Sequence, residues 1–188
     1  NDEAARQASR QEIIRRYYEA LCDQKKGKQV DEAIRKLELL MKKAGITPAE
    51  RKVVAPALEK AEETGDAAAA MELPDGTIVT GRTSDLLGAS SALLLNALKK
   101  LGGLPDDLHM ISPIVLEPIQ NLKTNHLGNR NPRLHTDETL IALSISASTN
   151  PMAKHAMEQL SKLRGCDVHS SVILSQVDER TFKRLGVN

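Results

Sequence analysis

The sequence predicts an α/β protein in which an N-terminal helical segment precedes a small sheet, made of a hairpin and two further strands and layered with helices. Three observations predict this class. Residues 1–65 carry apolar side chains at helical spacing. Beyond them, short β-type runs flank the turn Pro74-Asp75-Gly76, which is typical of a hairpin. Strand-like and helical runs then alternate, which favours an α/β layer with right-handed crossovers. We expect a helical segment over 1–65 and an α/β domain over 66–188.

Composition narrows the range of partners. The chain has 188 residues, and 26 Lys and Arg nearly balance 25 Asp and Glu, whereas a general nucleic-acid binder needs a cationic surplus. It has no Trp, two Tyr and one Phe, too few aromatic rings for stacking bases. No apolar run approaches the ~20 residues of a membrane helix. The two cysteines, Cys22 and Cys166, lack metal-site spacing and fit a reducing cytosol. We expect a cytoplasmic protein without nucleic-acid, membrane or metal partners.

The N-terminal segment carries signals for helix ends but no candidate chemistry. The second helix opens with acids, closes with lysines and meets Gly45, which suits a left-handed helix stop. Thr47-Pro48-Ala49-Glu50 is a capping box with proline at the first helical position. Pro56 divides the following helix, which we expect to end near Gly65. Residues 66–70 are expected to be a small-residue linker.

In the α/β region, alternation and capping residues predict the remaining elements. Pro113 and Pro151 suit the first turns of helices, and Thr136 and Asp178 are expected to cap two more. Gly128 is expected to end the helix that starts at Pro113. The predicted strands are 71–73, 77–80, 108–112 and 167–174, and the first long helix is 84–101.

The stretch after the hairpin is the leading candidate for a binding site. Gly81, Arg82, Thr83 and Ser84 combine a tight glycine, a cation and two hydroxyls at the expected start of the long helix. Free N–H groups at a helix start favour a phosphate or carboxylate, and an arginine adds a bidentate fork. Hydroxyl residues also occur there simply as helix caps, so that alternative stays open. The stretch is no Walker loop, because the GxxxxGK pattern is absent.

The loop 129–137 is the second candidate. Arg130, Arg133 and Thr136 could hold an anionic ligand, and His135 and Asp137 are candidate catalytic groups, because imidazole exchanges protons near neutral pH. An ordinary polar surface loop is the alternative. If both clusters serve one ligand, they should face the same cleft. The region contains neither an HExxH motif nor a GxSxG elbow, so a peptidase interpretation has no support in it.

Four runs together resemble a known family. They are RQEIIRRYYEALCDQKKG, ELPDGTIVTGRTSDLLGASSALLLNALKKLGG, HMISPIVLEPIQNLKTNHLGNRNPRLHTDETLIALSISASTNP and KLRGCDVHSSVILSQVDERTFKRLGVN. They resemble the C-terminal part of a widespread bacterial family of uncharacterised cytosolic proteins, some of them labelled ATP-dependent peptidases. The resemblance implies that complete members are longer and carry a nucleotide-binding N-terminal part with a GPGSGK-like stretch. It implies ATP or another nucleotide as their cofactor, and a site whose second wall lies in that part.

Two hypotheses of different kinds follow. In the first, this is the ligand-binding α/β domain of a nucleotide-linked cytosolic enzyme that binds a small anionic ligand; the sequence identifies no reaction. In the second, it is a structural module for homo-oligomer formation without an active site of its own. An exposed apolar stripe along Ile13, Tyr17, Leu21 and Leu37 would favour the second hypothesis.

Overall fold

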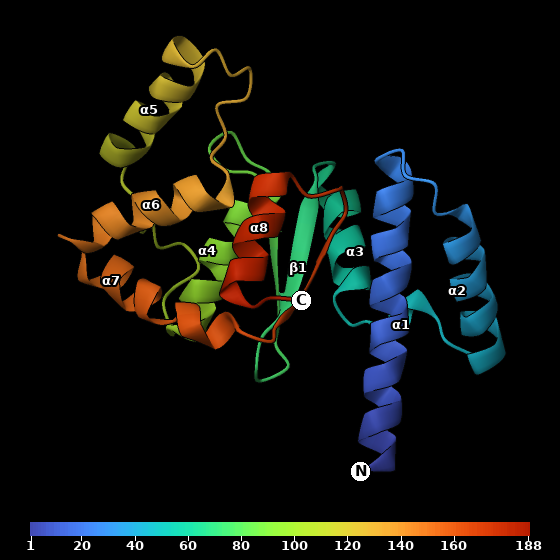
Figure 1. Ribbon diagram of the computed structural model, residues 1–188. Helices are drawn as coiled ribbons and strands as arrows, with labels where there is room; N and C mark the ends of the chain where they lie inside the picture. Colours follow the sequence, from blue (N-terminus) through green and yellow to red (C-terminus); the bar gives the residue numbers. More distant parts are fainter. The chain divides into compact units, whose positions relative to one another are not determined.

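A computed structural model describes residues 1–188 and divides them into two compact units, Asn1–Val54 and Ala55–Asn188 (Figure 1). The predicted fold class is confirmed, because a helical N-terminal segment precedes a mixed α/β region with one three-stranded sheet. None of the helices combines the length and apolar character that crossing a membrane requires.

The first unit is a helical hairpin followed by one short turn of helix. Helix α1 (Asp2–Lys25) packs on α2 (Asp31–Ala44) around a small core of buried Ile14, Met41 and Ile46. Gly45 ends α2 in the left-handed conformation, with φ of 60°, as predicted. The expected capping box is present at η1 (Pro48–Glu50), where the Thr47 N–H donates to the Glu50 carboxylate at 3.0 Å. The helix stop at Gly45 and the capping box at Thr47 are therefore present where the sequence predicted them.

The second unit contains an antiparallel sheet of order β2-β1-β3. It opens with α3 (Val54–Thr64), and the strands are β1 (Ala68–Glu72), β2 (Ile78–Arg82) and β3 (Asp167–Ser170). Both outer strands pair antiparallel with β1, in the registers Ala68↔Arg82 and Ala69↔Ser170. The expected crossover arrangement is therefore wrong. The C-terminal ends of β2 and β3 nevertheless lie at the same edge of the sheet, beside the start of β1.

Helices cover the sheet and complete the main core. α4 (Ala89–Leu101) packs on β2 and β1, and its Leu93, Leu94, Ala97 and Leu98 are fully buried. Figure 1 shows α6 and α7 extending away from the sheet as an antiparallel pair, with α5 above them. The remaining helices are α5 (Pro113–Asn121), the π-helical turn η2 (Leu122–His126), α6 (Thr136–Ala147), α7 (Pro151–Glu158), η3 (Leu160–Leu163) and α8 (Gln176–Leu185).

Two strand predictions were wrong, for the same physical reason. Residues 66–70 were expected to be a linker, but Ala68–Ala70 form most of the central strand and are fully buried. Alanine has a low intrinsic strand preference, which the tertiary environment overrides here. Conversely, residues 108–112 form no strand, although Met110 and Ile111 are buried. Their apolar pattern reflects burial in the core without pairing to the sheet. The strand expected at 167–174 ends at Ser170.

The helix expected to start at Ser84 instead starts at Ala89, after Gly88. The Ser84 hydroxyl accepts the N–H groups of Leu86 and Leu87, at 3.3 and 3.1 Å, and closes a local turn. Such side-chain to backbone bonds compete with helix formation. The stretch after β2 is therefore a turn followed by an extended segment and presents no helix N-terminus at Ser84.

Candidate functional site

The two sequence-predicted clusters meet beside the sheet edge where β2 ends. Leu87 and Leu134 form a parallel bridge, in which the Leu134 N–H donates to the Leu86 carbonyl at 3.0 Å and the Gly88 N–H to the Leu134 carbonyl at 3.3 Å. Nε of Arg133 donates to the Ser84 carbonyl at 2.5 Å. The turn after β2 and the loop before α6 are thus held side by side, although 49 positions separate Ser84 from Arg133.

A buried lysine fixes the loop from its inner side. The Lys123 side chain is 5% exposed, and its ammonium donates to the Arg133 carbonyl at 2.5 Å and to the Glu138 carboxylate at 2.7 Å. Glu138 also accepts the backbone N–H of His135 at 2.9 Å. Lys123 lies in the π-helical turn η2, a rare conformation that is frequent at functional sites. The main chain from Arg133 to His135 is therefore held in one place by charged groups.

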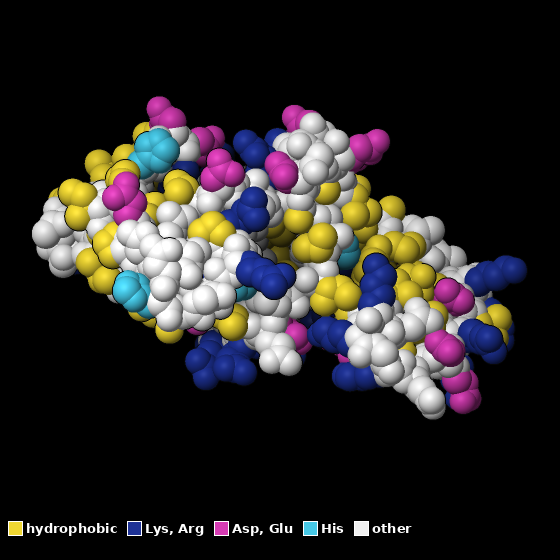
Figure 2. Space-filling view, turned by 90° about the horizontal axis from the view of Figure 1, so that it is seen from above, with side chains coloured by type: hydrophobic (Ala, Val, Ile, Leu, Met, Phe, Trp, Pro, Cys, Tyr) yellow, Lys and Arg dark blue, Asp and Glu magenta, His cyan; other side chains and the backbone are white.

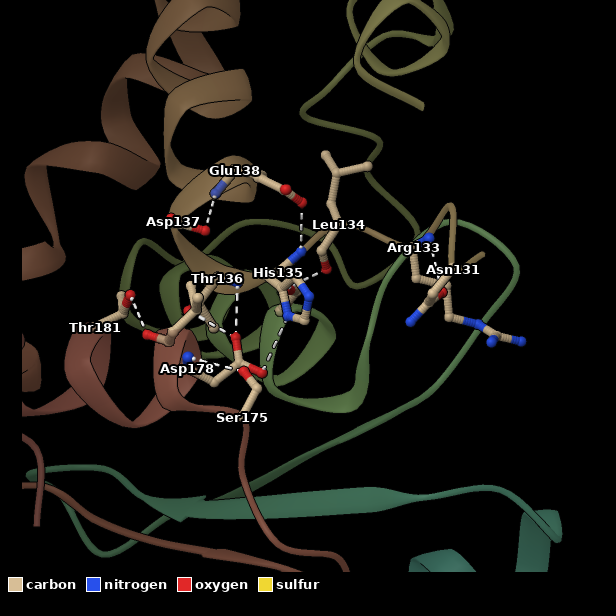
Figure 3. A network of polar contacts seen from close by, with 12 residues as sticks. Asn131, Arg133, Leu134, His135, Thr136, Asp137, Glu138, Ser175, Asp178 and Thr181 are labelled. Atoms are coloured by element: carbon tan, nitrogen blue, oxygen red, sulfur yellow. Dashed lines mark hydrogen bonds and ion pairs between the residues drawn. The ribbon is translucent and has the colours of Figure 1, made fainter. Parts of the chain in front are cut away.

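A carboxylate from the last helix faces the imidazole of His135 (Figure 3). The Asp178 Oδ1 accepts both the N–H and the hydroxyl of Thr136, each at 2.9 Å, and Oδ2 lies 3.6 Å from Nδ1 of His135. The Asp178 side chain is 14% exposed, and that of His135 is 37% exposed. Ser175 caps α8 by accepting the Asp178 N–H at 3.1 Å. Ser175, and not Asp178 as expected, is the cap, which leaves the Asp178 carboxylate for this contact.

Arginines supply positive charge around the same place. Arg82 lies at the end of β2 and contacts Asp66 at 3.4 Å, in an exposed pair. The guanidinium of Arg133 donates to a carbonyl and pairs with no carboxylate, and Arg130 is exposed on the loop. Figure 2 looks onto this end of the second unit and shows Lys and Arg side chains exposed on it, with acidic side chains close to them.

The structure gives different roles to the remaining predicted residues. Gly81 is buried in β2 against α4, where a Cβ atom would lie 2.2 Å from the Leu93 nitrogen, so its role is close packing. The Thr83 N–H pairs with the Ala67 carbonyl at the sheet edge. Thr136 is fully buried and holds Asp178. Asp137 is exposed, and its carboxylate accepts the neighbouring Glu138 N–H. Of the two candidate catalytic groups, only His135 lies in the polar network.

Sequence reasoning missed Lys123, Glu138 and Asp178. Each looked ordinary in its own segment: a helical lysine, a first-turn acid and a helix cap. The one available signal was the lysine, because Lys123 shares a helix face with Ile119 and Leu122 flanks it. A cation among apolar neighbours has to find a partner when the helix packs. Nothing in the local sequence linked Asp178 to His135.

A hollow of about 410 Å³ lies at the opposite end of β1, near the hairpin turn. Its lining includes Glu72, Asp75, Arg164, Cys166 and Asp167. Burial raises the pKa of the Cys166 thiol, with Asp167 and Glu72 adding to the effect. A thiol of raised pKa stays protonated at neutral pH and is a weak nucleophile. We therefore place the candidate site at the other end of the sheet.

Comparison with protein families supports the resemblance seen in the sequence. Residues 49–188 match the C-terminal part of a domain of unknown function, DUF1846. The chain belongs to the DUF1846 family. Residues 1–45 match the N-terminal part of the same family.

Relatives in other bacteria are similar along the whole chain. A UPF0371 protein of Corynebacterium urealyticum is 54% identical over 187 residues, and one of Streptococcus pneumoniae is 52% identical over 188 residues. The alignments cover 100% of this chain but 38% of each relative. The chain thus spans well under half the length of these relatives.

Proposed function

We propose that the second unit binds a small anionic ligand, bearing phosphate or carboxylate, where the turn after β2 meets the loop before α6. The observation that carries this proposal is the bond from Nε of Arg133 to the Ser84 carbonyl, which brings the two predicted clusters together. That bond uses one edge of the guanidinium and leaves its two terminal nitrogens available. Arginine binds phosphate and carboxylate through two parallel N–H bonds, so these nitrogens suit the ligand.

The charges around this place favour an anion. Arg82 precedes Ser84 by two residues and Arg130 precedes Arg133 by three, and both are exposed. Asp66 pairs with Arg82 at 3.4 Å, and both of these side chains are exposed. Exposed pairs of this kind contribute only about 0–1 kcal/mol, so a ligand can displace Asp66 at small cost. Arg133 supplies a cation that is held by the Ser84 carbonyl, and exposed Arg82 and Arg130 supply further positive charge.

We further propose that the whole protein is a cytoplasmic, nucleotide-linked enzyme in which this unit forms one wall of the site. The proposal rests on the family resemblance and on the length of the relatives, of which this chain matches 38%. Most of the polypeptide in those relatives lies outside the matched region and is available to supply a nucleotide site.

The test is binding of defined anions to the whole protein. Thermal-shift assays with inorganic phosphate, pyrophosphate and ATP should find at least one stabilising anion, and calorimetry should give its Kd. Arg133→Ala removes a charge-assisted bond worth about 1.5–3 kcal/mol and should weaken that Kd at least tenfold. Arg184→Ala, an exposed arginine near the end of α8, is the matched control and should bind as wild type. No stabilisation by any of the anions, or equal binding by both variants, would contradict the proposal.

Oligomer formation without a ligand site is the second candidate, and one observation favours it. Ile141 and Ile145 lie one turn apart on α6 and are 57% and 52% exposed, and Ile114 on α5 is 83% exposed. The stripe named in the sequence prediction is less supportive, because Ile13 and Tyr17 pack against the core of the first unit. Sedimentation of an Ile141→Asp variant tests this candidate: an oligomer held by this face should dissociate.

A further inference from the structure

The Asp178 carboxylate joins α8 to α6 through one oxygen and faces the His135 imidazole with the other. Asp178 accepts two bonds from Thr136 through Oδ1 alone, so its position does not depend on His135. Its second oxygen, Oδ2, faces Nδ1 of the imidazole at 3.6 Å, an ion-pair distance and longer than a hydrogen bond. Because catalytic hydrogen bonds are often long before a ligand binds, this spacing is compatible with a working pair.

The backbone at His135 is fixed by its own hydrogen bond and by the pairing of the residue before it. Its N–H donates to Glu138, which Lys123 holds, and the preceding residue, Leu134, is paired with Leu87. The conformation of His135 is extended, with φ of −76° and ψ of 170°. With the backbone held, the position of the ring depends only on its two side-chain torsions, and the Asp178 carboxylate lies 3.6 Å from Nδ1. The structure thus presents the imidazole to the Asp178 carboxylate from a fixed backbone.

His135 and Arg133 point to the same side of the chain. In an extended segment successive side chains alternate, so the residues on either side of buried Leu134 share a face. Figure 3 shows this arrangement, in which the Leu134 side chain points one way while those of Arg133 and His135 point the other. In the same view, the ring nitrogen of His135 that does not face Asp178 lies on the side of Arg133. An anion bound to Arg133 would therefore lie on the same side of this segment as the imidazole.

We propose that His135 is the proton-transferring group of this site and that Asp178 is its positioning residue; this inference rests on the anion binding proposed above. In the neutral ring, the proton on Nδ1 faces Asp178, which leaves Nε2 as the base. Nε2 accepts a proton from a hydroxyl group or water held beside the bound anion, and the electron pair of the broken O–H bond stays on that oxygen. The Asp178 carboxylate stabilises the resulting imidazolium, and the proton later leaves from Nε2. The ligand class is accordingly an anion that carries, or is attacked by, a hydroxyl group or water.

His155 provides a matched internal control. Its Nδ1 also lies 3.6 Å from a carboxylate, that of Glu158, but this carboxylate is 59% exposed. Its Nε2 lies 3.0 Å from the Gly102 carbonyl, which can only accept a hydrogen bond. His155 should therefore carry its proton on Nε2, and His135 should carry it on Nδ1. The two rings differ in the feature that the proposal requires.

The first measurement determines the tautomer of each histidine by nitrogen-15 NMR of the whole protein, at a pH at which both rings are neutral. We expect the Nδ1–H form for His135, the Nε2–H form for His155, and a return of His135 toward the Nε2–H form of free imidazole in Asp178→Asn. Glu158→Gln should change neither ring by this criterion. A neutral His135 that already carries its proton on Nε2 in wild type would overturn the assignment of Asp178. A purely structural Asp178 would affect stability and leave the tautomer unchanged.

The second measurement is the rate at which diethyl pyrocarbonate modifies each histidine, followed by peptide mass spectrometry with and without inorganic phosphate. His135 should react at least several-fold faster than in Asp178→Asn, and phosphate should protect it while leaving His155 unchanged. If phosphate binds by calorimetry but does not protect His135, the proton-transfer inference is wrong and the binding proposal stands. If no anion binds, the binding proposal fails, and the proton-transfer role that rests on it fails as well, whatever the tautomer.

Discussion

Replacement of Gly81 by alanine should strongly destabilise the second unit. A Cβ atom at this position would lie 2.2 Å from the Leu93 nitrogen and 2.5 Å from its Cα, whereas ordinary contacts begin at 3.4 Å. The obstructing atoms belong to the backbone of α4, so no side-chain rotation can relieve the clash. Helix α4 would have to move by about 1.2 Å, the difference between 3.4 and 2.2 Å. That movement would loosen the contacts of Leu94 and Leu98, both fully buried.

The expected loss of stability follows from the cost of overpacking a core. An added methylene typically costs about 1–3 kcal/mol where side chains can yield. Because a backbone is less able to yield, we expect a loss of at least about 3 kcal/mol, or about 6–12 °C in Tm for a protein of this size. Urea unfolding by circular dichroism, with hydrogen exchange of the α4 amides, measures it. Gly88→Ala is the control: its nearest neighbour would be the Leu134 carbonyl at 3.8 Å, and stability should change by less than about 1 kcal/mol. Equal effects of the two changes would refute the packing role of Gly81.

Three further outcomes are expected. Lys123→Met leaves a buried carbonyl and a carboxylate without their ammonium and should cost about 1–3 kcal/mol in urea unfolding, whereas Lys36→Met, which removes an exposed pair, should stay within about 0.5 kcal/mol. Ser91→Ala removes the buried bond to the Leu134 carbonyl and should cost about 1 kcal/mol in the same assay. The Arg10 guanidinium forms two bonds of 2.8 Å with Glu50 and lowers the pKa of that carboxyl below its ordinary 4.5. The contribution of this pair to the stability of the first unit is therefore complete above pH 4.5 and is lost as the pH falls through the lowered pKa. Fluorescence of the two tyrosines, both on α1, should report this acid loosening, and Glu50→Gln should remove that pH dependence; an unchanged acid profile in that variant would count against it.

The sequence predicted the local features of the fold well, because each depends on residues close together in the chain. Gly45 and Gly128 end helical segments with φ of 60° and 71°, as expected. Asn150 caps α7 by accepting the Met152 N–H at 2.9 Å, with proline at the first helical position. The hairpin turn contains Gly76 at φ of 83°. Side-chain to backbone bonds and left-handed glycines are satisfied within a few residues and need no partner from elsewhere.

The strand assignments were less successful, because a strand depends on its partners. Ala68–Ala70 carry no strand signal, yet they form the centre of the sheet, and residues 108–112 carry one without pairing to any strand. Nothing in the sequence indicated that β3 runs antiparallel to β1. Pairing of β1 with β3 joins residues such as Ala70 and His169, which lie far apart in the chain. Burial then selects the conformation, whatever the intrinsic preference of each residue.

The sequence by itself determined the fold class, the ends of most helices and two segments rich in anion-binding groups. Only the tertiary structure decided that these segments adjoin through Arg133 and Ser84, that Gly81 serves packing, and that Asp178 faces His135. The reason is physical: caps, turns and charge order act over one or two helical turns, whereas the partner of a buried or half-buried polar group is set by which elements pack together. A carboxylate 42 residues beyond Thr136 becomes its neighbour only when α6 and α8 meet.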